Sequence, residues 1–157
     1  MTSAALARNA ALAAALLVAA GGGAARAAAA VPGTDAKARA AAVAERRALG
    51  ALAPGGASRA RYARALAHVR ASVSDLLAIE SRLAAAARET GPIPGGEAIL
   101  LRLDEAYGGA NLAATHLGQA IWLLDRGAGY GAPSVSQLRS DVRRALRASR
   151  ALEQLLR

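Results

Sequence analysis

The regular spacing of apolar residues in three proline-free segments is the feature that most constrains the fold of this chain. In residues 58–90, 97–126 and 134–156, such positions recur at alternating intervals of three and four. This spacing aligns side chains along one face of an α-helix and is typical of helices that pack side by side at about 20°. The seam positions are Tyr62, Leu66, Val69, Val73, Leu76, Glu80, Leu83 and Ala87; Leu100, Leu103, Tyr107, Ala110, Ala114, Leu117, Ile121 and Leu124; and Val135, Leu138, Val142, Ala145, Ser149, Leu152 and Leu156.

Clusters of glycine and proline at 54–56, 91–96 and 127–133 separate these segments from one another and from a weaker, alanine-rich segment at 35–52, which contains Val43, Leu49 and Leu52. Ser134 with Gln137 is typical of a helix start, and Gly91 and Gly127 are typical of helix ends. Phe is absent and aromatic residues make up 3% of the chain, which favours helix over strand. We therefore expect an all-α fold, an elongated up-down antiparallel bundle of three long helices plus one shorter N-terminal helix.

The first 30 residues have the parts of a secretory signal. Met1 to Asn9 contains Arg8 and no acid, Ala10 to Ala20 is apolar, and small residues follow. The A-x-A pattern predicts cleavage after Ala30 or Ala27, which leaves one domain at 31–157 and a periplasmic or secreted protein. A spanning helix needs about 20 apolar residues, and glycines 21–23 interrupt this run. An uncleaved anchor and a disordered cytosolic tail are the alternatives.

Composition excludes several classes of chemistry. The chain has no Cys, which removes disulfides and thiolate catalysis. The formal net charge is +9, but Lys37 is the sole lysine, and this Ala/Arg/Gly bias is typical of a bacterial genome with high GC content. We therefore predict no nucleic-acid partner. Outside the cytoplasm, a basic domain is expected to bind anionic lipid, a cell-wall polymer or an acidic protein.

Two features of the long helices are candidates for function. Glu80 occupies a seam position, where a carboxylate needs a partner, so we expect a buried ion pair; a ligand-binding or proton-active role is the alternative. A second stripe in residues 97–126 begins near Asp104 and receives another helix of the chain or forms an interaction face for a partner or a second copy. Its candidate residues are Gly108, Asn111, Thr115, Gly118 and Trp122.

Arginines flank the seam of the last segment at intervals of 4, 4 and 3, namely Arg139, Arg143, Arg147 and Arg150. They form a solvated face or a stripe for an anionic partner. His68 and His116 are expected on helix surfaces, as are Glu45 and the acids at 104–105. No motif for a catalytic, cofactor-binding or metal site is present, and we expect none of the three.

The segment KARAAAVAERRALG, from Lys37 to Gly50, resembles the first helix of secreted helical chorismate mutases. The resemblance implies an enzyme whose arginines and lysines surround a dicarboxylate in a helical core. That family has a further lysine in the continuing helix, whereas here Pro54 interrupts the chain. The resemblance covers 14 residues of Ala/Arg/Glu helix.

These observations predict an exported cell-envelope protein with a non-catalytic interaction or structural role, in which helix faces bind a protein partner, a second copy or an anionic envelope surface. A helical-bundle carrier of a small ligand is the first alternative, and the chorismate-mutase-like enzyme is the second.

Overall fold

Four α-helices make up the described part of the chain, and no strand occurs in it. The computed structural model describes residues 31–53, 58–127 and 132–157. The helices are α3 (Thr34–Ala51), α4 (Arg59–Thr90), α5 (Gly96–Asp125) and α6 (Val135–Leu155). The predicted all-α class is confirmed, with each helix end within one residue of the predicted position. The predicted signal segment lies outside the described residues, and none of the described helices has the length and apolar character needed to cross a bilayer.

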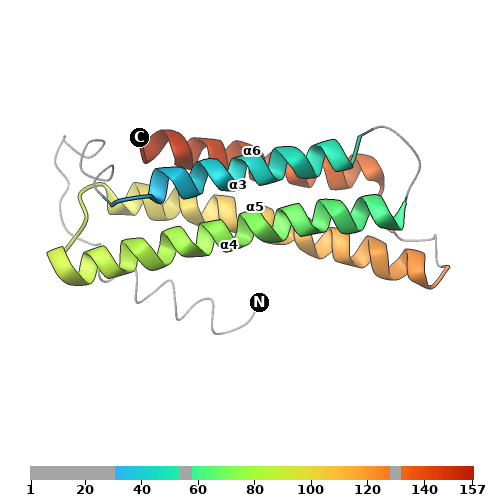
Figure 1. Ribbon diagram of the computed structural model, residues 1–157, viewed down its shortest axis with the longest axis horizontal. Coiled ribbons are helices and arrows are strands. Elements are labelled where there is room, and N and C mark those ends of the chain that lie inside the picture. Colours follow the sequence, from blue (N-terminus) through green and yellow to red (C-terminus); the bar gives the residue numbers. More distant parts are fainter. Residues whose placement is uncertain (1–30, 54–57, 128–131) are drawn as a thin grey trace.

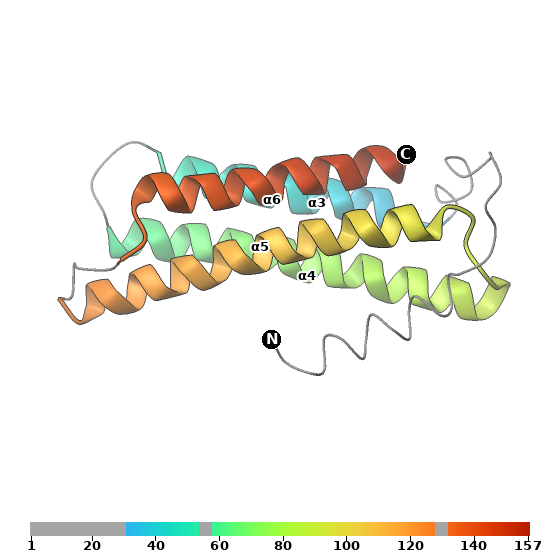
Figure 2. The same cartoon turned by 180° about the vertical axis from the view of Figure 1, so that it is seen from behind.

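The helices run alternately in opposite directions and form an elongated bundle (Figure 1). Each packs against two others, so that α3, α4, α5 and α6 close into a ring around one core. The longer helices α4 and α5 extend beyond α3 and α6, and α5 crosses α6 obliquely (Figure 2). The outward faces of α5 and α6 together form one long side of the molecule.

The glycines and the serine that the sequence predicts at helix ends occupy those positions. Gly91 follows α4 with φ 83°, and Gly127 follows α5 with φ 65°, a left-handed conformation that glycine adopts without a steric penalty. Ser134 caps α6 by accepting a hydrogen bond from the Gln137 backbone N–H at 3.1 Å. The Gln137 side chain does not return to the cap but donates to Asp141.

The seam predicted for α6 forms its buried face, and the seams of α4 and α5 are rotated slightly. In α5, Leu103, Ala110 and Leu117 are buried as expected, but the intervening core positions are Ile99, Ala106, Ala113 and Ala120. The residues that follow these four, Leu100, Tyr107, Ala114 and Ile121, pack half-buried against the core. Neighbouring apolar residues broaden the buried face, so spacing alone does not choose between adjacent positions.

Helix α3 differs from the prediction because its contact face consists of small residues. Val43 is exposed, whereas Leu52 is buried and Leu49 is half-buried. The buried face contains Ala38, Ala41, Ala42, Ala44 and Ala48, together with Thr34 and Glu45. Methyl side chains allow the backbones of neighbouring helices to approach closely, so tertiary packing rather than the largest apolar residue selects this face.

Candidate binding site on the α5–α6 face

A surface hollow of about 460 Å³ lies between α5 and α6. Its lining is Arg102, Glu105, Gly108, Gly109, Leu112, Arg144, Arg147, Ala148 and Ala151. The two helices come close together here because Gly109 has no side chain: a Cβ at this position would lie 3.2 Å from Cα of Ala145. Gly109 therefore lets α6 approach α5, and arginines from both helices border the hollow.

The charge of this hollow is strongly positive. Arg102 donates to Glu105 at 2.7 Å, so the single carboxylate of the lining already has a partner. Among the described residues, neither Arg144 nor Arg147 forms an ion pair. Both are exposed, and the planar guanidinium group binds carboxylates through two parallel hydrogen bonds. The hollow therefore presents two unpaired cations to an anionic ligand.

A histidine–aspartate pair lies about one helical turn beyond the hollow. Nδ1 of His116 on α5 is 2.8 Å from Oδ2 of Asp141 on α6, and Gln137 Nε2 donates to Oδ1 of the same carboxylate at 3.1 Å. Asp141 is buried, whereas His116 is half-buried. The expected surface position of His116 holds only in part, because the side chain is half-buried and has a partner on another helix. Because 25 residues separate the two partners, the sequence pattern contains no signal for this pair.

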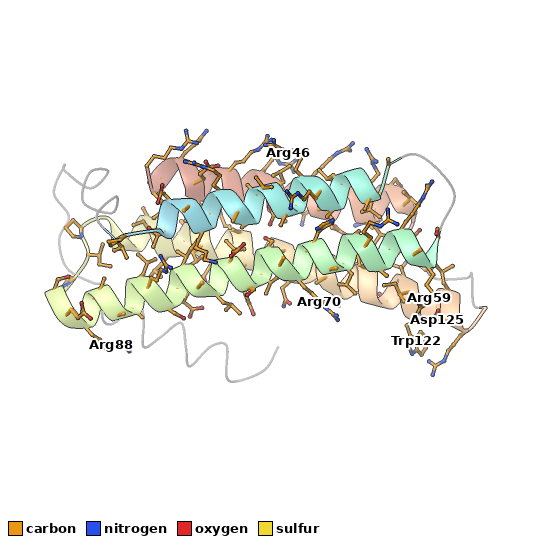
Figure 3. The ribbon with its side chains drawn as sticks, in the orientation of Figure 1. Arg46, Arg59, Arg70, Arg88, Trp122 and Asp125 are labelled. Atoms are coloured by element: carbon orange, nitrogen blue, oxygen red, sulfur yellow. The ribbon has the colours of Figure 1, made fainter. Side chains whose placement is uncertain are left out.

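The predicted second stripe of α5 faces solvent. Gly108, Asn111, Thr115 and Trp122 are exposed, and Gly118 is half-buried. The interpretation that this stripe receives another helix of the chain is wrong for these residues; the neighbouring Gly109 receives α6 instead. Trp122 is 54% exposed near the end of α5 (Figure 3). The guanidinium of Arg126 is stacked 3.8 Å from the centre of the Trp122 ring.

The predicted arginine stripe of α6 divides into different environments. Arg139 is half-buried and donates at 2.6 Å to the carbonyl of Leu52, which satisfies a free acceptor at the end of α3. Arg143, Arg147 and Arg150 are exposed, and of these three Arg147 lines the hollow. Arg144, which the sequence pattern did not single out, contributes to the hollow in place of Arg139.

The buried carboxyl of the core is Glu45, not Glu80. Glu80 is only half-buried although it occupies a predicted seam position, because the neighbouring Ile79 takes the fully buried position. Glu45 has no exposed surface, so its interpretation as a surface acid is wrong. The signal was present in the sequence: Glu45 is the fourth of six residues in a 4-3-4-3-4 series that runs from Thr34 through alanines to Leu52.

Two serine hydroxyls form hydrogen bonds with Glu45. Ser72 on α4 donates to Oε1 at 2.7 Å, and Ser149 on α6 donates to the same oxygen at 3.0 Å. Oε2 is buried and has no hydrogen-bond partner among the described residues. Burial raises the pKa of Glu45 to about 7, and the two hydroxyls oppose this rise. The bundle therefore favours the neutral carboxylic acid below neutral pH.

The cations of α3 do not converge in the core. Lys37 Nζ lies 2.7 Å from Asp75, and Arg39 lies 3.2 Å from Glu153, both toward the edges of the helix. Arg46 and Arg47 are exposed. The core side of α3 presents a carboxyl group where a chorismate-mutase-like site needs positive charge, so the described residues do not supply the arrangement that this resemblance implies.

Comparisons of the chain with protein-family models, with curated proteins and with solved structures find no match. The function is therefore argued from the site alone.

Proposed function

We propose that this protein is a non-catalytic binding protein whose α5–α6 face binds an acidic segment of a protein partner. The observation that carries the proposal is the hollow of about 460 Å³, which three arginines and one acid of two packed helices line. Arginine-rich surfaces concentrate carboxylate ligands by long-range attraction and hold them through bidentate hydrogen bonds.

The remaining lining favours a peptide over a simple anion. Leu112, Ala148 and Ala151 provide apolar surface beside the arginines. A helix that alternates apolar and acidic side chains would cover these residues with one face and pair with Arg144 and Arg147 at its edge, as in other helix-in-groove complexes. The proposed partner is therefore an acidic amphipathic helix.

The proposal includes export, so that the partner is a periplasmic or extracellular protein. Its support is the signal-like leader with its A-x-A sites at 25–30. The mass of the protein recovered from separated cell fractions tests this part. A chain that begins at Val31 or Ala28 in the periplasm or medium is expected, and a full-length cytosolic chain contradicts it.

Binding is tested with a fluorescent synthetic helix that carries leucine and glutamate on adjacent faces. The double variant Arg144→Ala/Arg147→Ala is expected to weaken binding about 10- to 100-fold, because it removes two charge-assisted contacts. Arg143→Ala/Arg150→Ala removes the same charge from exposed positions outside the hollow lining and should change the Kd less than about threefold.

Two results would contradict the proposal. Equal weakening by the two double variants would mean that net charge alone attracts the peptide. Binding to vesicles of anionic lipid, with no measurable binding to the peptide, would assign the arginines to a membrane surface instead. Both titrations are repeated at higher salt, where the loss should be largest for contacts between exposed charges.

A further inference from the structure

The outward side of α5 carries large apolar residues that no part of the described chain covers. Leu101 is 60% exposed and Trp122 is 54% exposed, and Leu112 between them is 39% exposed. Trp122 projects from the lower side of the bundle (Figure 3). Leu101, Gly108, Thr115 and Trp122 recur every seven residues and so lie along one stripe, with small residues in the middle and bulky ones at both ends.

The residue types of this stripe match across its midpoint, between Asn111 and Leu112: a large apolar residue stands at each end and a small residue at each inner position. Leu101 lies ten residues before Asn111, and Trp122 lies ten residues after Leu112. Gly108 and Thr115 lie three residues from the same two positions. If a second α5 packs in the opposite direction, each Leu101 therefore meets Trp122 of the other copy, and each Gly108 meets Thr115.

Charged residues at the helix ends obey the same symmetry. Glu97 lies fourteen residues before Asn111, and Arg126 lies fourteen residues after Leu112, so antiparallel pairing brings opposite charges together at both ends. Arg126 is already held over the Trp122 ring. Asp104 falls opposite Gln119 in this register, so these stripe positions bring no like charges together.

We propose that the protein forms a homodimer through antiparallel pairing of α5 with α5 of a second copy, with the two-fold axis between Asn111 and Leu112. A two-fold interface is self-complementary, and in this register the stripe pairs opposite charges at Glu97 and Arg126 and apolar side chains at Leu101 and Trp122. The 3-4 spacing keeps the two helices in contact along the stripe at a crossing angle of about 20°. Gly108 and Leu112 belong both to this stripe and to the lining of the hollow, so dimerisation and acidic-peptide binding compete for part of one face, and each is tested with its own variants.

Cysteine cross-linking tests the register, because the chain contains no Cys and has no thiol background. Leu112→Cys lies beside the proposed axis and is expected to form a disulfide-linked dimer on mild oxidation. Gly108→Cys alone should not, because two copies of this position are offset by about 10 Å along the helix. The same holds for Thr115→Cys alone, but an equal mixture of these two variants should cross-link.

Other cross-linking patterns overturn the proposal. Cross-linking of each single variant with itself would indicate parallel pairing, and failure of both Leu112→Cys and the mixture would place the interface elsewhere. All three positions are exposed, and circular dichroism confirms that each variant is folded.

Dimerisation itself is measured by sedimentation over a range of protein concentrations. Trp122→Ala and Leu101→Ala should each raise the dimer dissociation constant about tenfold or more, since they remove the apolar ends of the stripe. Glu97→Arg should weaken the dimer, and adding Arg126→Glu should restore it. Arg143→Ala/Arg150→Ala removes the same charge from exposed positions outside the hollow lining and should leave the dimer unchanged, which separates loss of the interface from a general change in net charge. A protein that stays monomeric at every concentration contradicts the proposal.

Discussion

The two sides of α6 accommodate a buried carboxyl group in different ways. On the side of α3, Glu45 meets the hydroxyl of Ser149 and is closed off from water. On the side of α5, Asp141 is buried but has a nitrogen of His116 and the amide of Gln137 as partners, and His116 reaches the surface. A helical bundle can therefore bury a carboxyl group either in its neutral form or together with donors that connect it to solvent.

The largest expected effect is a pH dependence of stability that arises from Glu45. Its pKa is raised from 4.5 to about 7 in the folded protein, so the folded state holds a proton that the unfolded chain releases. The contribution of Glu45 to the free energy of unfolding should be fully present below pH 4.5 and should fall by about 3 kcal/mol as the pH rises from there through 7. Urea unfolding at pH 5 and pH 8 measures this difference.

Glu45→Gln is the matched control, because the amide keeps the shape and still accepts from Ser72 and Ser149. We expect this variant to lose most of the difference between pH 5 and pH 8. An unchanged pH dependence in Glu45→Gln would show that another group is responsible. Ser72→Ala removes one of the two donors that stabilise the ionised form, so it should destabilise the protein more at pH 8 than at pH 5.

A smaller loss is expected on the α5 side. Asp141→Ala leaves Gln137 and His116 without their acceptor and should lower the free energy of unfolding by about 2 kcal/mol, the usual cost of orphaning polar groups. The double variant Asp141→Ala/His116→Ala gives the coupling between the pair when it is compared with the two single variants. Additive effects within about 0.5 kcal/mol would mean that the contact contributes nothing measurable.

The smallest expected effect is a difference in stability between alanine variants of two adjacent glycines of α5. Gly108→Ala places a methyl group in open space and should stabilise the helix by up to about 1 kcal/mol. Gly109→Ala places it against the backbone of Ala145 and should destabilise by about 1 kcal/mol despite the same gain in helix propensity. Thermal unfolding of the two variants measures the difference, and equal stabilisation would mean that α6 does not approach α5 as described.

The helix ends were predictable because glycine, proline and serine act locally. Gly91, Gly127 and Ser134 have the roles that their neighbours in sequence indicate. The contact face of α3 was less predictable, because alanine lies on several sides of this helix and provides no contrast between inside and outside. Val43 is larger than the alanines around it, yet packing against α4 and α6 leaves it exposed.

The residue types of the candidate site were predictable from the sequence, but which individual residues line it was not. The arginine-rich character of α6 and the glycines of α5 were visible in the sequence, and both contribute to the hollow. Arg102 and Arg144 were not selected, because their proximity depends on how α5 crosses α6. The pairing of His116 with Asp141 depends on the same crossing. Contacts between helices need the rotation of each helix, which broad apolar faces do not fix.

The buried alanines of α3 limit the substitutions that this sequence can accept during evolution. Ala38, Ala41 and Ala48 are completely enclosed. Any larger residue there must force two backbones apart, and glycine, the sole smaller choice, weakens the helix. A core of leucines tolerates exchange among residues of similar volume, but an alanine has no neutral substitute of its own size. The side of the bundle that consists of buried alanines is therefore the side that tolerates the fewest substitutions.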